Sequence, residues 1–307
     1  MFKHYRRSGQ LSSIDIKNEF TKKDGLRIFQ SDPKNIKSAS YDLTPTIIAM
    51  SAKHGMLETV YREKKYPFRY FITVKAKDTV LIVCNEYLRV PPYISGHIVS
   101  RVTRVTQGFG HISTSIDPNW DGALLIALSN PMNKPLKVYV GTNVLGLDSR
   151  NPLATVIFHY LNTPIQDARC EYPGMRIDLL KREHYANKTG FKQWIFKKTH
   201  FRRRAFTDFF FELCDAKKKY LGEGEWCNFV KQINGSENDE STKIKGRSKM
   251  LDFVVTETWY IRFLLWLQKH SWLWYVFLFG LLFVLWKVDL LSEELTEWIR
   301  STLDIFS

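Results

Sequence analysis

The sequence lacks the paired cysteines, the glycine-rich phosphate loops and the apolar leader that would identify several common protein classes. Its few cysteines include no Cys-x-x-Cys pair and have no histidine at zinc spacing, which favours free thiols in a reducing compartment and implies no structural metal. They are Cys84, Cys170, Cys214 and Cys227. No Rossmann or P-loop glycine pattern occurs. The basic start, Met1–Arg7, is followed by polar residues instead of a signal-peptide core, so we expect the body of the protein on the cytoplasmic side.

The composition is that of a folded and strongly basic chain. At 307 residues, 44% of them hydrophobic, the chain can build a sizeable core in one large or two modest domains, which excludes a disordered protein. The net charge of +14 and the isoelectric point near 9.5 favour anionic partners. Nucleotides, nucleic acid and an anionic membrane face all meet this condition, so the placement of the charges has to decide among them.

Strand patterns dominate residues 70–161. Short runs rich in β-branched and aromatic residues, such as Tyr70–Val74, Thr79–Cys84 and Thr155–Leu161, are separated by Pro, Gly and Asn turns. Many short strands without intervening helices predict a mainly β domain, built as a compact distorted barrel or a jelly-roll-like sandwich.

Several short motifs follow one another within residues 10–165. They are Leu11–Ile16, Ile36–Leu43 with its Tyr-Asp-Leu core, Pro91–Pro92, Ser100-x-x-x-Arg104, the Ile-Asp-Pro-Asn-Trp-x-Gly stretch Ile116–Gly122, Pro135–Gly141 and Ala154–Phe158. In this order they resemble the dCTP deaminase and dUTPase superfamily, with an insertion around 148–152. The resemblance covers half of the chain. It implies a dUTPase-like domain over residues 1–165, a nucleotide ligand and a homotrimer.

The Ser100-x-x-x-Arg104 motif, which follows the Pro91–Pro92 stretch, has the side chains that a phosphate group requires. Ser100, Arg101 and Arg104 bring a hydroxyl and two guanidinium groups within about one helical turn, which forms a fork for phosphate oxygens. The alternative is that these are ordinary arginines on a solvated helix.

Asp117 and Trp120 complete the predicted nucleotide-binding set. The resemblance implies that Asp117 faces the sugar 3′-hydroxyl and, in a dUTPase, orients the attacking water. The alternative for Asp117 is a turn-capping residue before a proline. Trp120 follows the same turn, whereas the dUTPase pattern has a tyrosine after this Asp turn that excludes ribose.

One position argues against deamination. Metal-free deaminases of this superfamily have a proton-shuttling glutamate on the strand after the Trp-x-Gly turn, and the matching residue here is Ala127, with no acid within five residues of it on that strand. Since alanine cannot carry a proton, the sequence predicts a pseudoenzyme unless another subunit supplies the acid. Val99 and Arg101 also differ from the family pattern, which has an arginine and a small hydroxyl residue there, so the ligand need not be dCTP.

Residues 166–232 form a basic region rich in aromatic side chains, most densely over 190–222. Three interpretations fit this pattern. The region could be a helix that lies on an anionic leaflet, a surface that binds single-stranded nucleic acid, or a helical subdomain with its aromatic side chains facing inward. The apolar run further along the chain favours the membrane over nucleic acid.

The C-terminal part has the pattern of a membrane anchor. A polar linker over 233–250 leads to a juxtamembrane helix over 251–270, a transmembrane helix over 271–288 that contains the uncharged run Ser271–Trp286, and an acidic amphipathic tail over 289–307. Basic residues before the span and acids after it predict an N-terminal domain in the cytosol. Two alternatives remain, namely a buried helix of a soluble domain and a hairpin in which 251–270 is a second short span.

These features together predict a single-pass protein of the inner or cell membrane that senses a nucleotide or a nucleotide-derived signal and passes it to a membrane segment, as a bacterial antiviral effector would. One alternative is a membrane-tethered, dUTPase-like pyrophosphatase that uses Asp117 and a magnesium ion brought with the triphosphate. Another is a trimeric membrane scaffold. The expected partners are a nucleotide, a membrane and further copies of the chain. Nucleic acid is not an expected partner, and no protein metal site is predicted.

Overall fold

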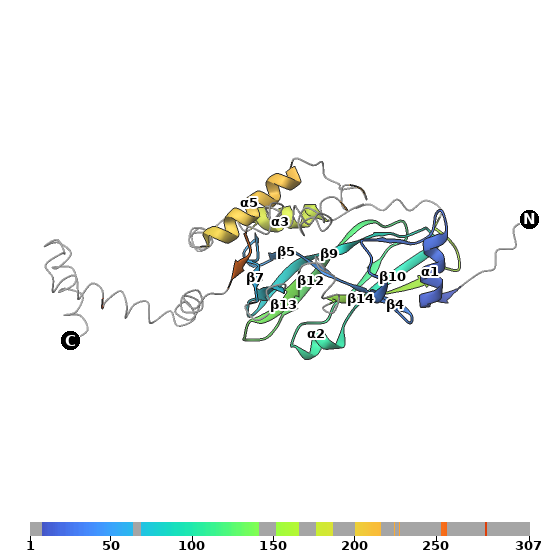
Figure 1. Cartoon of the computed structure of the whole chain (residues 1–307), viewed down its shortest axis with the longest axis horizontal. Helices are drawn as coiled ribbons and strands as arrows, with labels where there is room; N and C mark the ends of the chain where they lie inside the picture. Colours follow the sequence, from blue (N-terminus) through green and yellow to red (C-terminus); the bar gives the residue numbers. More distant parts are fainter. Residues whose placement is uncertain are drawn as a thin grey trace, which may run out of the picture. The chain divides into compact units, whose positions relative to one another are not determined.

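The computed structural model describes residues 8–63, 69–140, 152–165, 176–186, 200–215 and 253–256, together with Gly224, Cys227 and Gly280. The chain forms two compact units, Met1–Thr256 and Glu257–Ser307. Within the first unit, the described residues form three sheets with helices around them (Figure 1). Gly280 is the one described residue of the second unit, so the fold set out below is that of the first unit.

Sheet A holds the strand that leads into the predicted phosphate motif. Its order is β11, β10, β14, β4, β3, with β1 added beside β14, and its pairs are antiparallel. Along β10 the buried residues Ile94, Gly96 and Ile98 alternate with more exposed ones such as His97, so one face of the sheet packs inward. The bounds are β1 Gly9–Gln10, β3 Ile36–Lys37, β4 Ser40–Leu43, β10 Ile94–Ser100, β11 Ser113–Ile116 and β14 Ala154–Tyr160.

Sheets B and C complete the mainly β fold that the sequence predicts. Sheet B has the order β12, β9, β5, β6, with β2 also paired to β9, and sheet C has the order β13, β8, β7, β15. The bounds in sheet B are β2 Arg27–Phe29, β5 Pro45–Ser51, β6 Met56–Leu57, β9 Asp78–Arg89 and β12 Asp121–Asn130. The bounds in sheet C are β7 Tyr61–Arg62, β8 Tyr70–Val74, β13 Leu136–Val140 and β15 Val255–Thr256, the last being parallel to β7.

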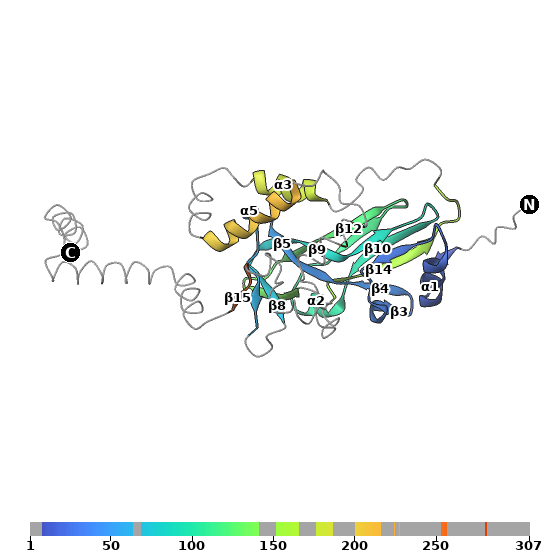
Figure 2. The ribbon, with the colours of Figure 1, turned by 45° about the horizontal axis from the view of Figure 1, so that its top comes forward.

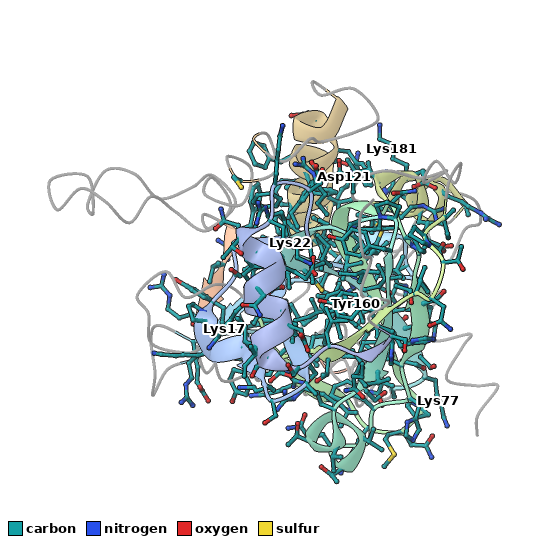
Figure 3. All side chains as sticks on the ribbon, turned by 90° about the vertical axis from the view of Figure 1, so that its right-hand side faces the viewer. Lys17, Lys22, Lys77, Asp121, Tyr160 and Lys181 are labelled. Carbon is teal, nitrogen blue, oxygen red and sulfur yellow. The ribbon has the colours of Figure 1, made fainter. Side chains whose placement is uncertain are left out.

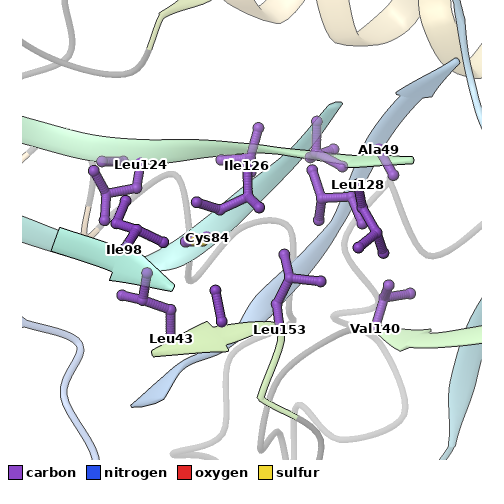
Figure 4. Packing of buried hydrophobic residues seen from close by; sticks show 14 of the residues in the cluster. Leu43, Ala49, Cys84, Ile98, Leu124, Ile126, Leu128, Val140 and Leu153 are labelled. Atoms are coloured by element: carbon purple, nitrogen blue, oxygen red, sulfur yellow. The ribbon is translucent and has the colours of Figure 1, made fainter. Parts of the chain in front are cut away.

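The core lies between the inner faces of these sheets. In Figure 4, Leu124, Ile126 and Leu128 of β12 point toward Ile98 of β10 and toward Leu153, and all five are at most 5% exposed. The alternation along β12 explains this, because Ile126 and Leu128 are buried while Ala127 between them is exposed. Burying such side chains contributes about 1.5–3 kcal/mol each.

Helix α1 (Ser13–Thr21) closes one end of sheet A. It begins at a capping box, in which the side chains of Ser12 and Asp15 each accept from the other's backbone N–H. The buried carboxylate of Glu19 accepts hydrogen bonds from the hydroxyls of Tyr93 (2.9 Å) and Tyr160 (2.7 Å), which fixes the helix against the strands. Figure 3 looks onto this helix and labels Lys17 on it and Lys22 directly after its end. Two shorter elements are η1 (Pro33–Asn35) and α2 (Val102–Thr106).

Helices α3 (Ile177–Ala186) and α5 (Phe201–Asp215) lie side by side over sheet B (Figure 2). Phe206 and Phe210 of α5 are at most 1% exposed, and the ring of Phe206 stacks on that of Phe253 at 5.3 Å. The helix also covers the free edge of β6. Thr207 accepts the N–H of Leu57 (2.8 Å), and the Arg203 guanidinium donates to the Leu57 carbonyl (2.9 Å).

These contacts revise the predicted division of the chain. For α5 the structure supports the helical-subdomain alternative, because Phe206, Phe210 and Phe211 are buried, while Phe201 at its start is 77% exposed. The contacts join residues 1–165 to the helices in one unit. The predicted juxtamembrane helix over 251–270 is wrong at its start, since Val255–Thr256 pairs with β7 as a strand. A strand forms here because the edge of β7 offers unpaired backbone groups.

The remaining C-terminal predictions fall on residues outside the described part. These are the linker over 233–250, residues 257–270, the transmembrane helix over 271–288 apart from Gly280, and the tail over 289–307. Among the described residues, no helix has the length and apolar character needed to cross a bilayer.

Candidate functional site

The Ser100–Arg104 motif forms the turn between β10 and β11. Ser100 ends β10, and its hydroxyl bonds to the backbone of Ile112, accepting from the N–H and donating to the carbonyl at 3.3 Å. Arg101 is the N-cap residue of the short helix α2, and Gly108 with a φ of +99° turns the chain away at its end. The motif is therefore held in place from both sides by backbone contacts.

Arg101 is engaged with a buried acid. Its guanidinium forms an ion pair with the carboxylate of Asp42 on β4, whose side chain is 2% exposed. The second oxygen of this carboxylate accepts the hydroxyl of Thr155 at 2.7 Å, and the ammonium of Lys37 lies 3.6 Å from the first. The structure thus brings the Tyr-Asp-Leu motif and the phosphate motif together, a contact that neither motif reveals by itself.

Arg104 is buried, although the sequence predicts an exposed residue that binds phosphate. Its side chain is 4% exposed, and its guanidinium donates to the carbonyl of Pro152 (3.3 Å) and to the side chain of Gln107 (3.2 Å). Burial, and then the nearby charge of Arg101, lower its pKa to about 10. Arg104 therefore stays charged at neutral pH.

Asp117 and Trp120 lie in the turn that joins β11 to β12. The Asp117 side chain is exposed, and among the described residues its carboxylate has no hydrogen bond or ion pair. Its carbonyl accepts the N–H of Trp120 at 3.2 Å, while Asn119 takes a φ of +62°. The half-buried Trp120 indole donates to the Gly122 carbonyl at 2.9 Å. The Asp117 carboxylate is thus available to a ligand, and no side-chain cap is formed.

Ala127 lies on β12 opposite Leu81 of β9, and its side chain is exposed. Because side chains alternate along a strand, Leu125 and Ser129 share its face, and both are neutral. This part of the strand therefore supplies no group that could move a proton.

The sequence reasoning missed Glu86, a fully buried acid near Asp42. Its carboxylate accepts the N–H of Thr44 (3.0 Å) and the Thr44 hydroxyl (2.6 Å). Burial raises its pKa to about 7, with the charge of Asp42 adding to the rise and the bonds from Thr44 opposing it. The available signal was the polar pair Asn85-Glu86 inside an otherwise apolar strand. The strand pattern ending at Cys84 in fact continues to Arg89.

Comparisons with known proteins agree with this arrangement. Residues 10–148 match the family model described as dCTP deaminase-like. The chain is similar to the "dCTP deaminase, dUMP-forming" of Aquifex aeolicus (strain VF5), with 22% identity over 134 residues, 42% of this chain and 74% of that protein. Residues 10–148 are therefore similar to a dCTP deaminase-like domain.

The solved structures that match part of the chain include a deaminase and dUTPases. The 2′-deoxycytidine 5′-triphosphate deaminase of Agrobacterium tumefaciens matches with 14% identity and a TM-score of 0.37, over 50% of this chain and 49% of that chain. A mutant dUTPase from phage phi11 of S. aureus matches with 11% identity and a TM-score of 0.30, over 48% of this chain and 97% of that one. The chain spans about half the length of the Agrobacterium deaminase.

Proposed function

We propose that this chain is a membrane-anchored nucleotide-binding sensor whose dCTP deaminase-like domain binds a nucleotide without deaminating it. The observation that carries the proposal is Ala127, which is exposed on β12 between neutral neighbours where a deaminase requires a proton-shuttling acid. The candidate nucleotide-binding residues lie in two places, with Ser100, Arg101 and Arg104 at one end of the β10–β11 pair and Asp117 and Trp120 at the other. A domain that can bind without turnover is suited to detect its ligand.

The anchor and the assembly are further parts of the proposal. The uncharged run Ser271–Trp286 suits a span of the inner or cell membrane, with the dCTP deaminase-like domain in the cytosol. A homotrimer would bring three such spans together, and ligand-dependent clustering could open the membrane in an antiviral response.

A second candidate function is nucleoside triphosphate hydrolysis. The exposed Asp117 carboxylate, which has no partner among the described residues, could orient a water at the ligand. This chemistry does not require an acid at position 127. It differs from the sensor in one measurable property, the formation of product.

The test is a ligand screen on the full-length chain, because a shortened chain that ends before Phe253 would lose β15 and the contact between Phe253 and α5. Thermal stability and mass-spectrometric product analysis are followed with deoxy-, ribo- and cyclic nucleotides, for the wild type and Asp117→Asn. Stabilisation without product supports the sensor. Product that disappears in Asp117→Asn supports the hydrolase. If no nucleotide binds in any condition, the sensor and the hydrolase are both contradicted, and the scaffold is favoured.

Membrane coupling needs its own measurement. The full-length chain is reconstituted in vesicles that contain a fluorescent dye, and leakage is followed with and without the nucleotide found in the screen. Ligand-dependent leakage supports an effector that opens the membrane. Leakage that is the same in both conditions, or absent in both, contradicts it.

A further inference from the structure

The contact between Arg101 and Asp42 leaves the acid with both oxygens occupied. One oxygen is paired with the Arg101 guanidinium and lies 3.6 Å from the Lys37 ammonium, and the other accepts the Thr155 hydroxyl at 2.7 Å. Asp42 is also 2% exposed. A buried carboxylate in this state is neutralised by its protein partners and has little capacity for another ligand.

Nucleoside triphosphates commonly arrive with a divalent cation, which prefers carboxylate oxygens. Beside the phosphate motif the described residues offer Asp42 and Glu86. The Asp42 carboxylate is paired with the Arg101 guanidinium. The Glu86 carboxylate accepts hydrogen bonds from the N–H and the hydroxyl of Thr44. Among the described residues, no three His, Cys, Asp or Glu side chains form a group that could hold a metal. The residues present at this position therefore do not fit a magnesium ion.

Arg101 retains donors for a second partner. A guanidinium presents five N–H groups in a planar fork, and one side of this fork is used by Asp42. The Nε of Arg101 is buried and has no hydrogen-bond partner in the described part of the chain. The Arg101 side chain as a whole is 27% exposed, so part of it is accessible to an anionic ligand.

On the basis of the proposed nucleotide site, we infer that Arg101 takes the place of a divalent cation. Its guanidinium neutralises Asp42 and presents its remaining donors to the phosphate of the ligand, so that the chain binds its nucleotide anion without magnesium. Arg101 is thus a binding residue that selects the metal-free anion. The serine or threonine expected at this position from the family pattern could not do this, because a hydroxyl carries no charge.

The first test uses manganese alone as a probe and needs no nucleotide. Free Mn²⁺ is measured by electron paramagnetic resonance in the presence of full-length wild type, Asp42→Asn, Arg101→Ser and Arg101→Ser combined with Asp42→Asn. We expect no Asp42-dependent binding in the wild type, and binding in Arg101→Ser that the second substitution removes. Binding by the wild type that is lost in Asp42→Asn would overturn the inference.

The second test compares deoxynucleoside triphosphate affinity in EDTA and in magnesium. The wild-type affinity should change by less than about threefold, whereas Arg101→Ser should need magnesium for an affinity within about tenfold of the wild type. Lys37→Ser is the matched control, because it removes the other cation near Asp42 and should leave the wild-type result unchanged. Arg101→Lys keeps the charge and serves if the serine variant does not fold.

The outcomes separate the two proposals. A wild-type affinity that rises about tenfold or more with magnesium contradicts the role of Arg101 and leaves the nucleotide site intact. If the wild type binds no nucleotide in either condition, the proposed function fails, while the manganese measurement still decides whether Arg101 excludes a cation from Asp42.

Discussion

Arg203 of α5 and Glu58 form a buried ion pair, with 2.6 Å between Nη2 and Oε1 and side chains that are 4% and 6% exposed. Burial raises the pKa of Glu58, and the Arg203 charge opposes that rise. The pair connects the basic aromatic segment to the β domain across a long stretch of sequence. One arginine of the Arg202–Arg204 cluster is therefore a structural residue, while its neighbours are exposed.

Replacing Arg203 with methionine should be strongly destabilising. Removing one partner leaves the Glu58 charge buried, at a cost of about 3–5 kcal/mol. Arg204→Met is the matched control, because Arg204 is about half exposed and makes an i,i+4 contact of 3.5 Å with Asp208, worth about 0.5 kcal/mol. Denaturant unfolding of both variants checks this, and equal losses would mean that the buried pair contributes no more than the exposed one.

The hydroxyl of Thr207 should matter more than its methyl group. Thr207→Val keeps the shape but leaves the buried Leu57 N–H without its acceptor, which costs about 1–3 kcal/mol. Thr207→Ser keeps the hydroxyl and loses one methyl group, about 0.8 kcal/mol. Hydrogen exchange at the Leu57 amide should accelerate in the valine variant and stay near wild type in the serine variant. The same exchange rate in both would show that α5 does not protect the edge of β6 through this bond.

Glu86 should make stability depend on pH. Its folded-state pKa is raised from 4.5 to about 7, so the folded protein holds this proton more firmly than the unfolded chain does. The contribution is fully present below about pH 4.5 and is lost as the pH rises through about 7, by about 3 kcal/mol at most. The free energy of unfolding of wild type minus that of Glu86→Gln should therefore fall between about pH 5 and 7. A constant difference across this window would show that Glu86 does not titrate in it.

Gly108 should not tolerate a side chain. At its φ of +99° a Cβ would lie 2.9 Å from Cγ of Met132, so Gly108→Ala combines backbone strain with a steric conflict, about 1–3 kcal/mol. Gly9→Ala is the control for strain alone, because Gly9 has a φ of +105° and no atom within 4 Å of such a Cβ. Adding Met132→Ala should recover part of the Gly108→Ala loss in thermal unfolding. No recovery would assign the whole effect to the backbone.

The turns that hold the candidate residues were predictable from the sequence, whereas the contacts of these residues were not. The Ser100–Arg104 motif lies at a turn after a strand, and Asp117 and Trp120 lie in the next turn, as the local patterns indicate. The partners of Arg101 and Arg104 come from β4 and from Pro152, which are far away in sequence. Local patterns carry no information about such pairs, because register and strand order decide them.

The same distinction applies to the whole protein. The sequence alone was enough for the mainly β character of the described residues within 70–161, since alternation, β-branched residues and Gly, Pro or Asn turns act over a few residues. Only the tertiary structure decided that Phe206, Phe210 and Phe211 of α5 face inward, that Val255–Thr256 joins β7, and that Arg101 pairs with Asp42. In each case the physical reason is burial. A buried charge, a buried aromatic ring or a strand edge contacts the residues that lie next to it in the folded chain. Which residues these are depends on the complete fold.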